Sequence, residues 1–142
     1  MKEFLLILFF SKVINLTAQS TAIDHKLSLN ASPPISAITP GALLEIDVSR
    51  AFKWRQDEDI MEYRKRIRSA IPSGSIKATL RNEKGNVATL VFRGSTSFDR
   101  ESTYLLLDSD VGIPIGVEFS HVEISSETML KDVNVIWKNY SK

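Results

Sequence analysis

Residues 76–93 read IKATLRNEKGNVATLVFR, and they carry the clearest indication of fold class in the chain. In the first part of this stretch apolar residues alternate with polar ones, which is the pattern of a strand with one face on a core. The central Asn-Glu-Lys-Gly-Asn, residues 82–86, is a glycine-containing turn. The last part, residues 87–93, has apolar residues at both odd and even positions, so it predicts a central strand buried on both faces. Together these features predict a β-hairpin.

The same alternation recurs upstream of the hairpin. Leu44, Ile46 and Val48 are predicted to share a face on the core, while Glu45 and Asp47 are predicted to face water. This pattern is typical of a strand at the surface of a β protein.

Two polar or proline-containing stretches predict loops. Residues 31–41 contain Pro33, Pro34 and Pro40, and proline has no N–H group to give to a sheet. Residues 94–102 are predicted as a polar loop.

The other stretches predicted as strands are residues 23–29, 103–107, 117–124 and 133–137. About seven strands in all predict a mainly β fold, an antiparallel β-sandwich that is either Ig-like or a small barrel.

One segment, residues 57–70, breaks the period of two and predicts a short helical insertion. Ile60, Tyr63 and Ile67 recur at spacings of three and four residues, as on one face of a helix. Acidic residues lie at its start and basic residues at its end, and both groups interact favourably with the helix dipole and so stabilise the helix. Glu62 is predicted to pair with Arg66 one turn later.

The N-terminus predicts export. Lys2 precedes an unbroken apolar run at residues 4–10, and small residues follow around Ser20. This order of a positive charge, an apolar stretch and small residues is that of a secretory signal peptide. We therefore expect residues 1–20 to be a signal peptide cleaved near Ser20, and residues 21–142 to form a single β-sandwich domain.

Charge and cysteine content restrict the expected cellular location of the protein and the classes of molecule that it could bind. The chain has 18 Lys and Arg, 17 Asp and Glu, and no Cys. Such a balance argues against nucleic acid as a partner, because binding phosphates requires an excess of basic residues. Lys12 interrupts the apolar run before it reaches the length of a membrane span, so we expect no stable membrane anchor in the mature chain. A periplasmic or secreted bacterial protein is the expected result.

The residues that usually carry catalysis are sparse. His25 and His121 are the two histidines, too few for a three-histidine zinc site. Residues 94–97 lack the second glycine of a serine nucleophile elbow. Asp108 and Asp110 resemble the start of a calcium loop, but they also fit a turn in which they bond their own backbone. The sequence therefore predicts no enzyme, no cofactor and no metal site.

The helical insertion is the predicted binding site. Trp54 lies among basic residues just before it, where the ring either anchors a partner or packs the helix onto the sheet. The basic residues of the helix are either a patch for an anionic partner or a solvated helix end. The candidate partner-binding residues are Trp54, Arg55, Asp57, Glu58, Arg64, Arg66 and Arg68.

These observations favour a non-enzymatic protein-binding module. We expect an envelope inhibitor or immunity-type protein that occludes a partner protein, such as a toxin or an envelope enzyme. The alternative is an adhesion module that binds carbohydrate or the cell envelope. That alternative expects Trp54 to be exposed beside another aromatic ring.

Overall fold

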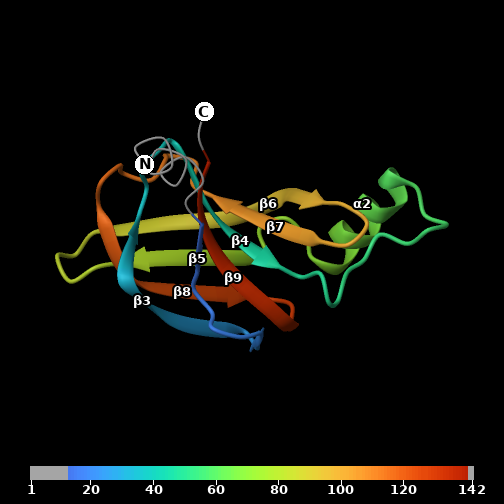
Figure 1. Cartoon of the computed structure of the whole chain (residues 1–142), viewed down its shortest axis with the longest axis horizontal. Helices are drawn as coiled ribbons and strands as arrows, with labels where there is room; N and C mark the ends of the chain where they lie inside the picture. The colour runs from blue at the N-terminus through green and yellow to red at the C-terminus, as the bar shows by residue number, and fades with distance from the viewer. Residues whose placement is uncertain (1–12, 141–142) are drawn as a thin grey trace, which may run out of the picture.

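Nine strands of one antiparallel sheet and one helix make up residues 13–140, the part of the chain that the computed structural model describes (Figure 1). The predicted mainly β class with antiparallel pairing is confirmed, with nine strands in place of about seven. The helix is α2 (Ile60–Ala70). The strands are β1 (Val13–Asn15), β2 (Thr21–Ile23), β3 (Lys26–Ser36), β4 (Gly41–Asp47), β5 (Ile76–Arg81), β6 (Val87–Phe98), β7 (Thr103–Asp108), β8 (Glu118–Ser126) and β9 (Leu130–Tyr140).

The sheet curls until its two ends nearly meet. Its strand order is β1-β9-β4-β7-β6-β5-β8-β3, and β2 also pairs with β9. At the end of β3, the carbonyl of Ser36 accepts hydrogen bonds from Trp137 Nε1 at 3.1 Å and from Asn139 Nδ2 at 3.2 Å. The side-chain oxygen Oδ1 of Asn139 in turn accepts a hydrogen bond from the backbone N–H of Ile38 at 2.8 Å. Side-chain hydrogen bonds to β9 thus complete a sandwich-like, nearly closed barrel.

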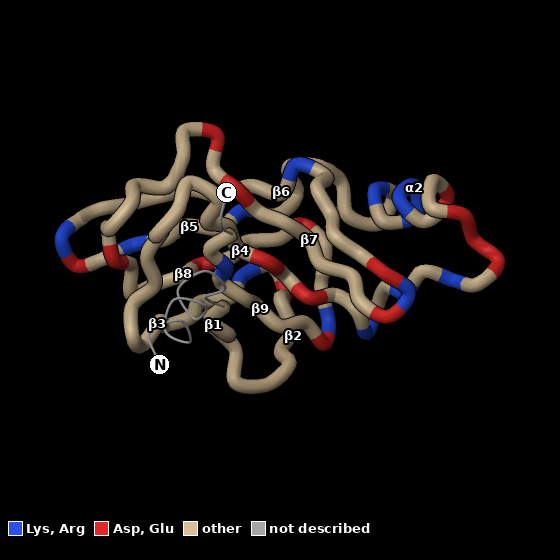
Figure 2. The backbone as a smooth tube through the Cα atoms, turned by 45° about the horizontal axis from the view of Figure 1, so that its top comes forward, with Lys and Arg blue, Asp and Glu red and all other residues tan. Residues whose placement is uncertain are grey.

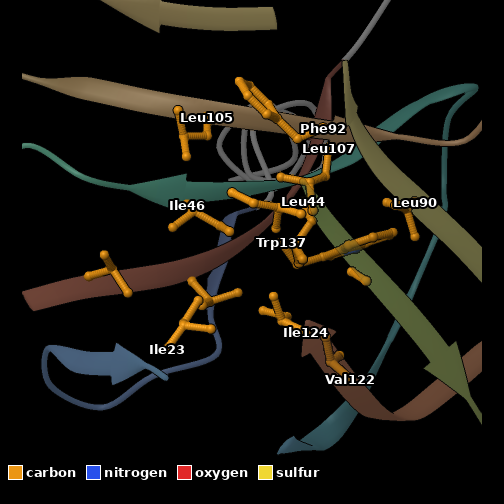
Figure 3. Packing of buried hydrophobic residues seen from close by; sticks show 14 of the residues in the cluster. Ile23, Leu44, Ile46, Leu90, Phe92, Leu105, Leu107, Val122, Ile124 and Trp137 are labelled. Carbon is orange, nitrogen blue, oxygen red and sulfur yellow. The ribbon is translucent and has the colours of Figure 1, made fainter. Parts of the chain in front are cut away.

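Trp137 lies in the middle of the core that this curvature encloses (Figure 3). It is fully buried, as are Leu44, Ile46 and Val48, whose predicted inward face is confirmed. The hairpin of β5 and β6 is also confirmed, with Ala78 paired with Leu90. Alternate residues of neighbouring strands fill the interior, as period-two patterning requires.

Glu45 departs from its predicted place in water. Its side chain is 3% exposed because the C-terminal part of β9 covers it. The Tyr140 hydroxyl donates a hydrogen bond to the Glu45 carboxylate, and Lys138 Nζ lies 3.9 Å from that carboxylate. Burial, together with the adjacent carboxylate, raises the pKa of Tyr140. A charge on a sheet face is tolerated there because it has partners.

Residues 31–36 form part of β3, so the prediction of a loop over residues 31–41 is wrong for them. Pro33 and Pro34 lie where the register between β3 and β8 shifts, between Asn30 and Ile35. Proline is tolerated at such irregular places and on outermost strands, where its missing N–H breaks no ladder.

β6 also runs further than predicted. It continues to Phe98, through half of the loop expected at residues 94–102. Its predicted burial on both faces is wrong for Val87, which is 52% exposed, whereas Leu90 and Phe92 are fully buried. The core covers the face of β6 that carries Leu90 and Phe92, whereas Val87 lies on the opposite face, at the end near the turn.

β1 pairs with the outer edge of β9. Ile14 lies opposite Trp137, and Thr17 Oγ1 accepts a hydrogen bond from the N–H of Val135 at 3.1 Å. The apolar run at residues 4–10 of the predicted signal peptide lies outside the described residues, and its cleavage near Ser20 stays a prediction. Within residues 13–140, no helix is long and apolar enough to cross a membrane.

Trp137→Ala is expected to lower the free energy of unfolding by about 3–5 kcal/mol, because it opens a cavity in the core and removes a donor from Ser36. Urea denaturation of both proteins measures this loss. Val87→Ala, on the exposed end of β6, serves as the control and should change stability by at most about 0.5 kcal/mol. A loss below about 1 kcal/mol for Trp137→Ala would contradict the central role of this side chain.

Candidate partner-binding site

The segment between β4 and β5 projects from one end of the barrel. α2 and the loop before it extend beyond the strands, at the end opposite the β5–β6 turn (Figure 1). This placement puts the predicted helical insertion outside the sheet and makes it accessible to another molecule.

Local sequence determines where the helix begins. The Asp59 carboxylate accepts a hydrogen bond from the backbone N–H of Glu62 at 2.8 Å, and the Glu62 carboxylate accepts from the N–H of Asp59 at 3.1 Å. This reciprocal capping box satisfies two free N–H groups at the helix start. The helix therefore begins at Ile60, later than the predicted residues 57–70.

Arg66 pairs with Glu58 rather than with Glu62, so the predicted pairing one turn apart is wrong. Arg66 Nε and Nη2 donate to the two oxygens of Glu58 at 2.9 and 3.0 Å, and Nη2 also donates to the Lys53 carbonyl at 2.6 Å. Two-point pairing of this kind is stronger than a single contact. Glu62 is engaged in the capping box instead.

This ion pair changes the titration of Glu58. The hydrogen bond from Arg66 lowers the pKa of Glu58 to about 2, against an opposing effect of burial. A hydrogen bond from the backbone N–H of Arg55, at 3.2 Å, acts in the same direction as Arg66. The carboxylate therefore stays charged and keeps the loop against the helix at any pH well above 2.

Trp54 lies in an aromatic cluster that joins the loop, the helix and the sheet. Its ring is parallel to that of Tyr63 at a centroid distance of 6.5 Å and perpendicular to that of Phe98 at 5.6 Å. The Arg100 guanidinium lies 3.6 Å from the Trp54 ring centroid, and Trp54 Nε1 donates to the Glu58 carbonyl at 2.7 Å. Perpendicular aromatic pairs and cation–π contacts are both attractive. The half-buried Trp54 thus packs the insertion onto the end of β6.

Tyr63 attaches the helix to β7 of the sheet. It is fully buried, and its hydroxyl is hydrogen-bonded to Thr103 Oγ1 of β7 at 2.5 Å. Ile67 and Ile71 are buried beside it, as the spacing of three and four predicted. Burial raises the pKa of Tyr63, which keeps its hydroxyl protonated. Tyr63, Ile67 and Ile71 therefore attach the insertion to the sheet.

The outer face of α2 combines basic and apolar side chains. Arg64, Lys65 and Arg68 are exposed, and none of them pairs with a carboxylate of residues 13–140. The basic residues of α2 are blue in Figure 2. Ile60 and Met61 are 42% and 60% exposed. We name these five residues the outer α2 face. It is a basic, partly apolar surface on a rigid support.

The seven predicted site residues thus separate into two groups. Those that face inward and hold the insertion together are Trp54, Glu58 and Arg66. Those that are exposed are Arg55, Asp57, Arg64 and Arg68.

Several residues of this site are missing from the set predicted from sequence. Phe98 and Arg100 come from the end of β6 and the following loop, and no local pattern links them to Trp54. Ile60 fitted the spacing of the buried face, yet it is exposed because the helix begins there and its first turn projects beyond the sheet. Met61 is next to it.

The turn at Asp108 and Asp110 faces an arginine. Arg93 Nη2 lies 2.7 Å from the Asp110 carboxylate, and Arg93 Nη1 also bonds to Asp108. In the described part of the chain, no three His, Asp or Glu side chains form a group that could hold a metal ion.

Acid is expected to release the loop from the helix. Because the pKa of Glu58 is lower in the folded chain than its usual 4.5, its contribution is complete above pH 4.5 and is lost as the pH falls towards about 2. The NMR signal of the Trp54 indole N–H, which bonds to the Glu58 carbonyl, should move over this range. The Trp137 indole, bonded to Ser36, is the internal control for global unfolding. A Trp54 signal that moves equally in Glu58→Gln would contradict this prediction.

Trp54→Ala is expected to loosen the insertion without unfolding the sheet. Limited proteolysis should become faster at residues 50–59, while the Trp137 indole signal keeps its position. Trp54→Phe is the matched control, because it keeps an aromatic ring beside Phe98 while it loses the N–H donor and one ring of the indole. Global unfolding of Trp54→Ala would show that the ring belongs to the main core instead.

Comparisons with known proteins give no relative for this chain. No family model, no curated protein and no solved structure matches it. Its function therefore has to be argued from the geometry of the insertion.

Proposed function

We propose that this protein is an exported, non-enzymatic binding module that occludes a partner protein with the outer α2 face. In this proposal it acts as an inhibitor or immunity-type protein in the periplasm or outside the cell. The observation that supports it best is the difference between the two sides of α2. One side packs the helix against the sheet, and the other carries arginines without a carboxylate partner beside exposed Ile60 and Met61.

The composition of the outer α2 face fits a protein interface. Arginine and methionine are enriched in such interfaces, and a fixed support reduces the entropy lost on binding. Met61 provides an apolar anchor, and Arg64, Lys65 and Arg68 surround it with positive charge. These charges favour a partner with a complementary acidic surface.

The adhesion alternative finds less support in the contacts of Trp54. Stacking on a sugar requires a ring face that is free, and Trp54 is already contacted by Tyr63, Phe98 and Arg100. Phe98 is itself only half-exposed. The aromatic residues here serve the packing of the insertion, and we base the binding proposal on the exposed helix face.

Site-specific photo-crosslinking tests the proposal, with the full gene expressed so that the source cell exports the chain itself. A photoreactive phenylalanine analogue at Met61 should crosslink to one protein in envelope or culture fractions of the source cell. The same analogue at Lys84, in the turn at the opposite end of the molecule, is the control and should give no such product (Figure 1).

Charge reversal then tests the role of the arginines. Arg64→Glu with Arg68→Glu should weaken the Met61 crosslink at least about tenfold, since two unpaired cations become anions facing an acidic partner. Lys77→Glu with Lys84→Glu, on β5 and the distant turn, is the matched control. A product that forms equally from both positions, or none from Met61, would overturn the proposal.

A further inference from the structure

A cavity of about 430 Å³ opens between α2 and β6. Arg64 and Arg68 line it from the helix, and Ser95 and Thr96 line it from the strand. The buried side chain of Ile67 also borders it. We propose that this cavity binds the carboxylate of an Asp or Glu side chain of the partner protein, an inference that rests on the proposed function.

The charges around the cavity are of one sign. Among the described residues that line it there is no carboxylate, although the chain as a whole has nearly as many acidic residues as basic ones, 17 against 18. Arg66, on another side of the same helix, has its charge matched by Glu58. Arg64 and Arg68 have no such partner within residues 13–140. The cavity therefore offers two cations whose positive charge is not compensated locally.

The strand side of the cavity is shaped by an irregularity in β6. From Phe92 to Thr96 this strand advances four residues, while β7 advances two, from Leu107 to Leu105. Gly94 lies inside the irregularity with a φ of +92°, which favours glycine. Bulges of this kind redirect side chains, and here the bulge brings the polar residues Ser95 and Thr96 under the helix.

The donors match a carboxylate. Arg64 and Arg68 are one helical turn apart, so their side chains are neighbours on the helix surface. Guanidinium groups donate in a planar fork that fits the two oxygens of a carboxylate, and hydroxyl groups supply further donors. Arg64 also lies over the Phe98 ring, at 5.8 Å from its centroid, which links the cavity to the aromatic cluster. An acidic side chain entering here would contact both the helix and the bulge.

The first experiment titrates the full, ¹⁵N-labelled chain with the capped peptide Gly-Glu-Glu-Gly. Its neutral counterpart, Gly-Gln-Gln-Gly, is titrated in parallel. We expect the acidic peptide to shift the amide signals of Gly94, Ser95 and Thr96 in a saturable manner, and the neutral peptide to leave them in place. Arg64→Gln with Arg68→Gln should weaken this binding at least about tenfold, because each charge-assisted hydrogen bond contributes about that factor or more. Lys77→Gln with Arg81→Gln, an exposed pair on β5, is the matched control and should bind as the wild type does.

Several results would overturn the inference. Equal shifts with both peptides, or undiminished binding by the double arginine variant, would show that the cavity does not recognise the carboxylate. Inorganic phosphate is the third probe, and tighter saturation of the same amides by phosphate would reassign the site to a free anion.

The two proposals fail separately. If Met61 crosslinks to a partner but the acidic peptide does not bind, the proposed function holds and the carboxylate site is wrong. If the peptide binds at Gly94 and Met61 gives no crosslink, the cavity takes an anion but the proposed function is wrong, and the assignment to a partner protein is wrong with it.

Discussion

The closure of the sheet through Ser36 is the constraint on which the rest of the structure depends. An open sheet of nine strands would leave its inner face in water, whereas the bonds from Trp137 and Asn139 to one carbonyl bring β3 against β9. The core is then enclosed, and Trp137 can be buried with its N–H group satisfied. The end of β6 and the start of β7 in turn support the helical insertion, through Phe98 and Thr103.

The two sides of the short helix α2 differ in their contacts. Glu58, Tyr63 and Arg66 use their polar groups for contacts within the molecule, which hold the loop against the helix and the helix against the sheet. The neighbouring Arg64 and Arg68 are left with charge that nothing in the described chain neutralises. This contrast between a packed inner side and an uncompensated outer side is the physical basis of the proposed binding role.

The sequence predicted those features that depend on near neighbours. Alternation identified the hairpin and the inward face of Leu44, and spacing identified the buried face of α2. It failed where contacts between distant segments decide the outcome. Glu45 is buried because β9 covers it. Arg66 pairs with Glu58 because the loop before α2 folds back against the helix. Likewise, no local pattern could show that Arg100 lies on Trp54.

The pairing of β1 with β9 has a consequence for maturation. Residues 13–17, which belong to the predicted signal peptide, cover the outer backbone edge of β9 beside Val135 and Trp137. Cleavage near Ser20 would take this cover away, so precursor and mature chain would differ in surface as well as in length. In the precursor, residues 13–17 would protect this edge of β9 from pairing with strands of other molecules. The edge would become unpaired only after export and cleavage.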